Sequence, residues 1–459
     1  MSEDRKIFSR AFTYVITKTY LNDRRRLSAV LLGIVGGFSM TIFMSYVGLH
    51  LDDIRTTAWL IAFIFALRNI YQIFLRVPLG HFSQIVGRKP LLIGGCGLYA
   101  ISLFFMAIAT HWGFVIVAIT FLAIGMSCFW PVIFAYIGDF EDEHIGQSQG
   151  RLFQGTDIGA VLGALLAFLL LRRSHIEIQK IFTFKLQSLV VFPQMSAAMS
   201  PLRILFAWGS GISFLGVIGL AFFMPEVLKK EDRLQVDSKL KALGESFLSM
   251  FRNLAIVTKQ KKLNFIYILQ LFVAFLEYMV TAFFPFLIVS KGYPDDTVAQ
   301  IAWISAGVLL FFKPYMGKIV DKIGYKGPIY FTLLFSSAML VFMVIVDSLP
   351  GLIIIYMFYA ASSLTSYLGV NTGTTRVSKT TQRGMALGAL GFYVSFSRSI
   401  STLSLTPVWN NFGIDAVFIA TAIIVATAVI IIYVIFKFLD KKNSNEVNNS
   451  EIEVANQNS

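Results

Sequence analysis

Charged residues are scarce in this sequence of 459 residues, in which Asp, Glu, Lys and Arg together occupy 14% of the positions. An average soluble protein carries roughly 25%. Cysteine is scarcer still: Cys96 and Cys128 both lie in apolar stretches without Cys-x-x-Cys spacing, and we expect them to fill helices. These shortages exclude a disordered chain and a disulfide-rich scaffold, and they allow a soluble multidomain protein only if the apolar residues are dispersed.

The sequence also lacks the motifs of common catalytic and nucleotide-binding sites. No Gly-x-x-x-x-Gly-Lys-Ser/Thr, His-Glu-x-x-His, Gly-x-Ser-x-Gly or zinc-ligand pattern stands where it could work. We therefore expect neither an enzyme nor an ATP-driven transporter, and neither a metal nor another cofactor.

Apolar residues, by contrast, make up 56% of the chain and gather in blocks of about twenty. A helix of that length can cross the hydrocarbon of a bilayer, so the blocks predict an all-α membrane protein. Twelve blocks are present, with approximate spans 27–50, 57–79, 90–110, 112–137, 150–171, 202–223, 263–290, 297–317, 328–347, 350–371, 384–408 and 414–438.

The formal net charge of +13 comes mainly from the segments between the blocks. With both termini in the cytoplasm, 28 of the 39 lysines and arginines fall in cytoplasmic segments, seven in the opposite loops and four inside the blocks. Positively charged loops stay in the cytoplasm, so this asymmetry predicts a multi-pass protein of the cell membrane with cytoplasmic termini. The charge therefore gives no support to a nucleic-acid partner.

The breaks between the blocks divide the chain into five parts. A cytoplasmic N-terminal segment, 1–26, precedes a six-helix bundle, 27–223. A basic cytoplasmic loop, 224–262, leads to a second six-helix bundle, 263–438. The polar tail, 439–459, is cytoplasmic and predicted to be disordered.

The central loop contains an amphipathic pattern. Apolar residues recur there at helical spacing, which predicts a helix on the membrane surface. These residues are Leu240, Leu243, Phe247, Phe251 and Leu254.

A short sequence is repeated at corresponding positions of the two halves. The second block is followed by Gly80-His-Phe-Ser-Gln84-Ile-Val-Gly87-Arg88-Lys89, and the eighth by Gly317-Lys318-Ile-Val-Asp321-Lys322-Ile-Gly324-Tyr325-Lys326. Glycine permits close packing or a positive φ, and basic residues hold a turn in the cytoplasm. Each stretch is therefore predicted to form a short cytoplasmic hairpin between two helices.

The duplicated stretch resembles the loop signature of the major facilitator superfamily, Gly-x-Leu-Ala-Asp-(Arg/Lys)-x-Gly-(Arg/Lys)-(Arg/Lys). The resemblance covers 27–438 and implies two pseudo-symmetric six-helix bundles that rock around a central cavity. It also implies a conformational loop motif that includes an acid at the end of the fourth helix. Its residues here are Gly80, Gly87, Arg88, Lys89, Asp139, Gly317, Asp321, Lys322 and Gly324.

The sequence departs from the family pattern at three positions. Gln84 replaces the usual Asp of the first signature, and Tyr325 replaces the usual Arg of the second. By analogy with the family latch, contact between Arg88 and Asp139 is expected to remain while the contribution of the missing Asp is lost. Phe121 stands where many proton-coupled exporters have an Arg, so that coupling device is absent.

Charged side chains inside the blocks are costly, at roughly 2.5–3.5 kcal/mol each, and therefore tend to face a wet cavity or a partner. Arg68 lies near the middle of the second block with Gln72 on the same face, and Arg398 lies in the eleventh. Together with Glu277 they are the predicted cavity residues, with structural ion pairing as the alternative. Arg76, at the edge of its block, is explained by snorkelling.

Two acids are candidates for proton coupling. Glu277 lies near the centre of the seventh block, where poor hydration disfavours its charged form and favours reversible protonation. A permanent pair with Arg398 or Arg68 is the alternative. Asp157, in the fifth block, points away from a stripe of glycines and faces either a neighbouring helix or the cavity.

These observations predict a secondary active transporter that moves a small solute by alternating access and is coupled to protons. The intramembrane arginines favour an anionic or polar substrate, with small-molecule efflux and organic-anion or sugar uptake as alternatives. A transporter-like receptor that binds solute without moving it is the second functional class. The expected partners are the lipid bilayer, the substrate and protons, and we expect a monomer.

Overall fold

Twelve long helices form the main body of the computed structural model, which describes residues 23–172, 200–236, 238–294 and 296–457. Each coincides with one of the twelve predicted blocks, so the predicted all-α membrane fold is confirmed. Nine helices in the described ranges are long and apolar enough to cross a membrane by the criteria of length and composition. The twelve helices are α2 (Arg24–Asp53), α3 (Ala58–Val86), α4 (Arg88–Ile108), α5 (Trp112–Phe140), α6 (Ile145–Arg172), α8 (Pro201–Phe223), α11 (Lys261–Ser290), α12 (Asp296–Ile323), α13 (Lys326–Ile345), α14 (Leu349–Val377), α15 (Arg383–Phe412) and α16 (Ile414–Gln457).

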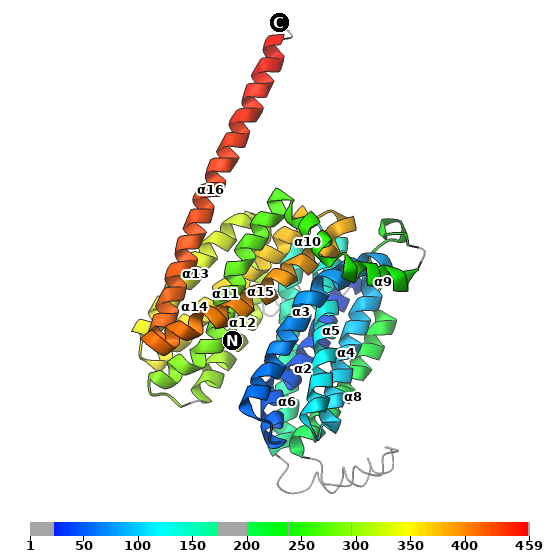
Figure 1. Ribbon diagram of the computed structural model, residues 1–459, viewed down its shortest axis with the longest axis vertical. Helices are drawn as coiled ribbons and strands as arrows, with labels where there is room; N and C mark the ends of the chain where they lie inside the picture. Colours follow the sequence, from blue (N-terminus) through cyan, green and yellow to red (C-terminus); the bar gives the residue numbers. More distant parts are fainter. Residues whose placement is uncertain (1–22, 173–199, 237, 295, 458–459) are drawn as a thin grey trace, which may run out of the picture.

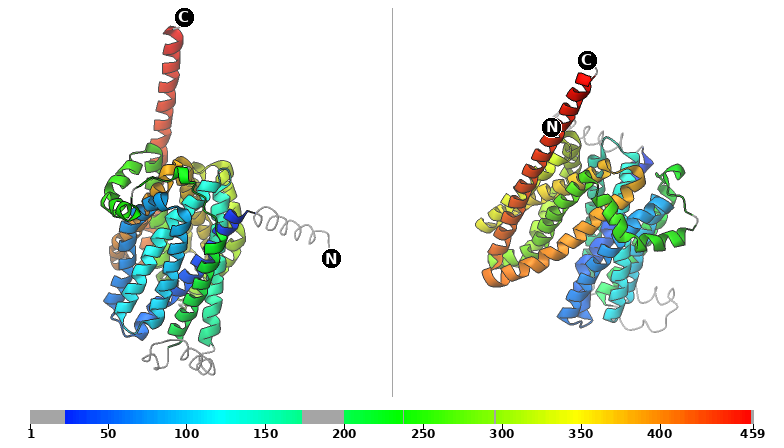
Figure 2. Two further views of the ribbon diagram at one scale, coloured as in Figure 1. Left: turned by 90° about the vertical axis from the view of Figure 1, so that its right-hand side faces the viewer. Right: turned by 45° about the horizontal axis from the view of Figure 1, so that its top comes forward.

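The helices form two bundles, α2 to α8 and α11 to α16 (Figure 1). The bundles meet mainly where α3 packs on α15 and where α6 packs on α12. Figures 1 and 2 show the short helices α9 (Lys239–Leu248) and α10 (Met250–Thr258) at one end of the molecule, here called the α9–α10 end. The two bundles are close together there and diverge toward the opposite end (Figure 1).

Several helices extend beyond the apolar block that predicted them. Helix α12, for example, begins at Asp296 and ends at Ile323, whereas its block covers 297–317. Its 28 residues rise about 42 Å, more than the roughly 30 Å of bilayer hydrocarbon. The additional turn projects at the α9–α10 end and carries part of the repeated loop.

The central segment differs from the single amphipathic helix that its pattern predicts. Helices α9 and α10 meet at Ser249, whose ψ of 9° departs from helical geometry. A short 3-10 turn, Lys230–Asp232, precedes them. The central loop is therefore folded against the bundles through two separate helices, with α9 on α3 and α10 on α15 and α11.

The tail is helical as far as Gln457, where α16 ends, although its polar composition predicts disorder over 439–459. No glycine or proline, the two residues least favourable inside a helix, occurs after 413. Residues 1–22 of the N-terminal segment lie outside the described residues.

Candidate functional site

The glycines of the repeated loop serve two different purposes. A Cβ on Gly80 would collide with the carbonyl of Gly384 on α15, and a Cβ on Gly317 would collide with that of Gly146 on α6. The first glycine of each repeat thus permits close contact between the bundles. The second, Gly87 or Gly324, has a φ of 107° or 88° and reverses the chain between two helices.

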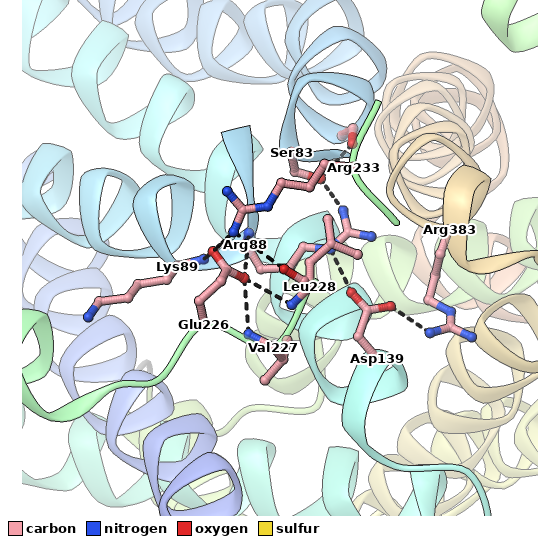
Figure 3. A network of polar contacts seen from close by, with 10 residues as sticks. Ser83, Arg88, Lys89, Asp139, Glu226, Val227, Leu228, Arg233 and Arg383 are labelled. Carbon is pink, nitrogen blue, oxygen red and sulfur yellow. Dashed lines mark hydrogen bonds and ion pairs between the residues drawn. The ribbon is translucent and has the colours of Figure 1, made fainter. Parts of the chain in front are cut away.

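Asp139, at the end of α5, joins the two bundles through two arginines (Figure 3). Arg88 Nε donates to its Oδ2 at 2.8 Å, and Arg383 Nη1 donates to its Oδ1 at 2.6 Å. Both Arg88 and Asp139 are buried, with side-chain exposures of 0% and 2%. Arg88 belongs to the same bundle as Asp139 and Arg383 to the other, so only the second contact must break if the bundles separate here.

Glu226 fixes the start of α4 against the segment that follows α8 (Figure 3). Its carboxylate accepts hydrogen bonds from the backbone N–H groups of Arg88 and Lys89, each at 3.1 Å. It also accepts bonds from the N–H groups of Val227 and Leu228 at 3.0 and 3.1 Å. An acid is favourable at this helix N-terminus because the free N–H groups carry partial positive charge.

The repeat of the second bundle makes a corresponding contact with the first. Asp321 accepts hydrogen bonds from the backbone N–H groups of Gly146 and Gln147 at 2.9 and 2.8 Å, at the beginning of α6. Arg376 Nη2 on α14 also donates to Asp321 at 2.7 Å. Arg376 thus supplies a cation although Tyr325 occupies the usual Arg position of the repeat, while Lys322 is exposed on α12.

Asp157 and Lys313 form an ion pair between the bundles near mid-helix. Asp157 lies twelve residues after the start of α6, and Lys313 ten residues before the end of α12. One turn earlier on α6, Gln154 Nε2 donates to the carbonyl of Leu310 on α12 at 3.1 Å. The sequence left open whether Lys313 snorkels or binds a partner, because nothing in the local sequence indicates that α6 lies alongside α12.

A cavity of about 410 Å³ lies between the bundles. Residues of both line it: the first bundle contributes the guanidinium of Arg76, and the second contributes Arg398 and Glu277. Aromatic and small polar side chains complete much of the wall, including Trp130, Phe153, Thr281, Tyr356, Tyr359, Ser363 and Tyr367. A second cavity of about 620 Å³, between α2, α6 and α12, includes Asp157 in its largely apolar wall.

The structure brings Glu277 and Arg398 together. Arg398 Nη2 lies 3.1 and 3.2 Å from the two carboxylate oxygens, and its guanidinium lies 5.9 Å from the centre of the Tyr278 ring. Helices α11 and α15 both belong to the second bundle. This pair can therefore persist while the two bundles move relative to each other.

Arg76, which the sequence interpretation assigned to the membrane edge, is a buried cavity residue. Its Nη2 donates to Gln72 Oε1 at 2.6 Å, and its Nη1 donates to the carbonyl of Gly391 in the other bundle at 2.8 Å. Gln72 therefore positions Arg76. The available signal was the spacing of Arg68, Gln72 and Arg76, which places all three on one helix face.

Arg68 lies one turn further from the α9–α10 end than Gln72. Its Nη1 approaches Met44 Sδ at 2.9 Å, and its charge interacts unfavourably with that of Arg398. Three guanidinium groups and one carboxylate thus lie in or beside the cavity. A guanidinium presents a fork of donors that fits a carboxylate or phosphate, so this region is suited to binding an anion.

Two helical bundles around a central cavity lined by charged and aromatic side chains are an arrangement typical of membrane transporters. The family model of the Major Facilitator Superfamily matches residues 29–402, and the chain belongs to this superfamily. The predicted family is thus confirmed, together with membership of a class that transports solutes.

Solved structures of other transporters share the fold at low sequence identity. The human organic anion transporter MFSD10 (TETRAN) has a TM-score of 0.65 and 15% identity, over 89% of this chain and 99% of that one. The proton:xylose symporter XylE has a TM-score of 0.65 and 15% identity, over 89% and 94%. FucP in the outward conformation has a TM-score of 0.67 and 14% identity, over 91% and 99%. A comparison with curated proteins finds no match.

Proposed function

We propose that this protein is a secondary transporter that moves a small organic anion across the cell membrane by alternating access. The observation that carries the proposal is the excess of positive charge in the wall of the central cavity, where Arg76 and Arg398 supply two guanidinium groups and Glu277 the one carboxylate among the lining residues. Arg68 and Gln72, both predicted as cavity residues, are not among the residues that line it. The structural neighbours include an organic anion transporter and a proton:xylose symporter, so both an anion and a sugar are substrates of proteins with this fold. The charge excess favours the anion.

The orientation in the membrane follows from the basic loops. The α9–α10 end carries the basic central segment and both repeated loops, so it is the cytoplasmic end. The bundles are joined there by Asp139 and Asp321, and nearer the middle of the helices by Asp157, and they diverge at the opposite end (Figure 1). The conformation is thus closed to the cytoplasm and faces outward.

Substrate binding to Arg76 and Arg398 can shift the equilibrium between two arrangements of the bundles. They lie on different bundles, so an anion that contacts both is bound best when the two halves have a particular separation. A ligand shifts a conformational equilibrium only through its different affinity for the two states. Glu277 holds Arg398 in place, and Gln72 holds Arg76.

Asp157 is better placed than Glu277 to couple a proton to this movement. The Asp157–Lys313 pair crosses between the bundles and must break when the cytoplasmic end opens, whereas Glu277–Arg398 lies within one bundle. Protonation of Asp157 removes the electrostatic attraction to Lys313 and lowers the cost of separation. The cavity beside Asp157 provides room for water to deliver the proton.

Counterflow in proteoliposomes tests transport and substrate class together. Vesicles loaded with an aromatic carboxylate should take up the labelled compound, and unlabelled carboxylates should compete while neutral sugars and organic cations should not. Arg398→Gln and Arg76→Gln should each raise KM at least tenfold if about 1.5–3 kcal/mol of charge-assisted binding is lost. Binding of carboxylates without counterflow would instead identify a receptor, and competition by neutral sugars alone would refute the anion assignment.

A second comparison tests the coupling residue. The double variant Asp157→Asn with Lys313→Gln removes the ion pair without leaving an unpaired charge, and it should retain counterflow while losing accumulation driven by a pH gradient. Glu277→Gln should alter KM and retain that accumulation. Accumulation by the double variant equal to wild type would exclude Asp157 as the coupling group.

A further inference from the structure

Helices α9 and α10 present one face to the bundles and leave an apolar stripe uncovered. The face against the bundles consists of Ala242, Ser246, Met250, Asn253 and Val257, all buried. Beside it, Phe247 and Phe251 are exposed, Phe251 by 67%, and Leu243 and Leu254 are partly exposed at the same helical spacing. Leu248, at the end of α9, is 89% exposed. The structure does not describe the side chain of Leu240, the remaining member of the predicted stripe.

Basic side chains occupy another face of the same two helices. Lys241 on α9 and Arg252 on α10 are exposed, as is Lys259 directly after α10. Around the helix axis Lys241 is displaced by about 120° from Phe247 on α9, and Arg252 by about 100° from Phe251 on α10. An uncovered apolar stripe with lysines and arginines on the polar side is the arrangement of helices that lie in the interface of an anionic membrane. An apolar stripe that stabilises the protein interior is buried against neighbouring helices, here α3 or α15, whereas this stripe is exposed.

The contacts of these helices place them close to the ends of the bundle helices that they touch. His81 Nδ1 on α3 lies 2.8 Å from Ser246 Oγ on α9, and His81 precedes the end of α3 at Val86 by five residues, or about 7.5 Å. At the other end of the segment, Gln260 Nε2 donates at 3.0 Å to Gln382 Oε1, directly before α15. The two helices thus lie beside the ends of the bundle helices.

We propose that α9 and α10 bind the anionic cytoplasmic leaflet, with the apolar stripe Leu243, Phe247, Phe251 and Leu254 inserted below the headgroups and Lys241, Arg252 and Lys259 held at their phosphates. Helix α9 packs on α3 of the first bundle, and α10 packs mainly on α15 and α11 of the second. The lipid-bound segment therefore spans the junction that separates when the cytoplasmic end opens. The proposal rests on the cytoplasmic assignment of this end, but it does not depend on the identity of the substrate.

Spin labels on neighbouring residues can test the insertion directly. Single nitroxide labels are placed at Phe247→Cys on α9 and Phe251→Cys on α10, with Arg252→Cys, about 100° around α10 from Phe251, as the control. The unsubstituted protein serves as the blank, because Cys96 and Cys128 are both buried. The full-length protein is reconstituted in phosphatidylcholine vesicles with about one quarter phosphatidylglycerol, which supplies the anionic surface.

Collision rates with oxygen and with a water-soluble nickel complex report the depth of each label. The ratio of the oxygen collision rate to the nickel collision rate should be at least fivefold higher for the labels at 247 and 251 than for the label at 252. In pure phosphatidylcholine, or when Lys241→Gln, Arg252→Gln and Lys259→Gln are combined, nickel access at 251 should rise at least twofold.

Two results would overturn the proposal. Equal nickel access at 251 and 252 in the anionic vesicles would show that the stripe faces water and is free for a protein partner. Unchanged depth at 251 without phosphatidylglycerol would show that the anionic headgroups play no part. Neither result bears on counterflow of the substrate, so failure here is distinguishable from failure of the proposed transport function.

Discussion

Asp139 contributes both to the folding stability of the first bundle and to the contact that closes the two bundles together, and variants of its two partners can test each contribution separately. Its two carboxylate oxygens are bound by different arginines, Arg88 from the same bundle and Arg383 from the other. Arg383→Gln removes the contact between the bundles and leaves Asp139 paired with Arg88. Arg88→Gln removes the contact within the first bundle and leaves the one to Arg383.

The two variants should change different quantities, one the equilibrium between closed and open states and the other the folding stability. A hydrogen bond between charged groups contributes about 1.5–3 kcal/mol, so Arg383→Gln should shift the equilibrium between closed and open cytoplasmic ends about 10- to 150-fold toward the open state. Loss of one partner from a buried ion pair costs about 3–5 kcal/mol. Arg88 is fully buried, so Arg88→Gln should mainly lower the melting temperature.

Distance measurements by pulsed electron resonance can compare the two variants. Labels at the exposed positions Asp142 and Lys379 report the separation of the bundles, because the first lies between α5 and α6 and the second between α14 and α15. Arg383→Gln should increase the long-distance population with little change in melting temperature, and Arg88→Gln should do the reverse. Equal shifts of the distance distribution in both variants would refute the division of roles at Asp139.

Two further predictions concern packing. Gly317→Leu should favour the open cytoplasmic end by about 1–3 kcal/mol, because its side chain would occupy the place of the Gly146 carbonyl. The matched variant Gly307→Leu lies on the same helix, where a Cβ would meet nothing within 4 Å, and it should leave the label distances unchanged. Equal effects of the two variants would contradict the close-packing argument. Cys96 and Cys128 are buried, with exposed fractions of 0% and 7%, so they should resist maleimide in the folded protein and react after denaturation. Rapid labelling of the native protein would show that the first bundle is packed differently.

The secondary structure of this protein was largely predictable because its solvent is a bilayer. In hydrocarbon every backbone polar group must be satisfied within the segment, so an apolar block of about twenty residues has little alternative to a helix. The predicted blocks consequently coincide with α2 to α16 in the main body. The continuation of α16 over 439–457 was not predicted, because the polar composition of this segment is typical of a disordered tail.

The candidate site was predictable only in part. Intramembrane charge singled out Arg68, Glu277, Arg398 and Asp157 because its energetic cost is visible in the sequence. The same reasoning placed Arg76 at the membrane edge, since an arginine near a block end can reach the headgroups. The structure places it in the cavity wall, bonded to the carbonyl of Gly391.

The bilayer environment, the helices, the two halves and the loop signature could be recognised from the amino-acid sequence, because each depends on a local pattern of hydropathy, charge or spacing. The partners of the charged side chains became known from the three-dimensional packing. Glu277 pairs within one bundle, Asp157 pairs across to Lys313, and Asp139 does both through Arg88 and Arg383. Which of these bonds a separation of the bundles would break depends on which bundle holds each partner. That is a property of packing between residues far apart in the sequence, such as Asp139 and Arg383, which are 244 positions apart.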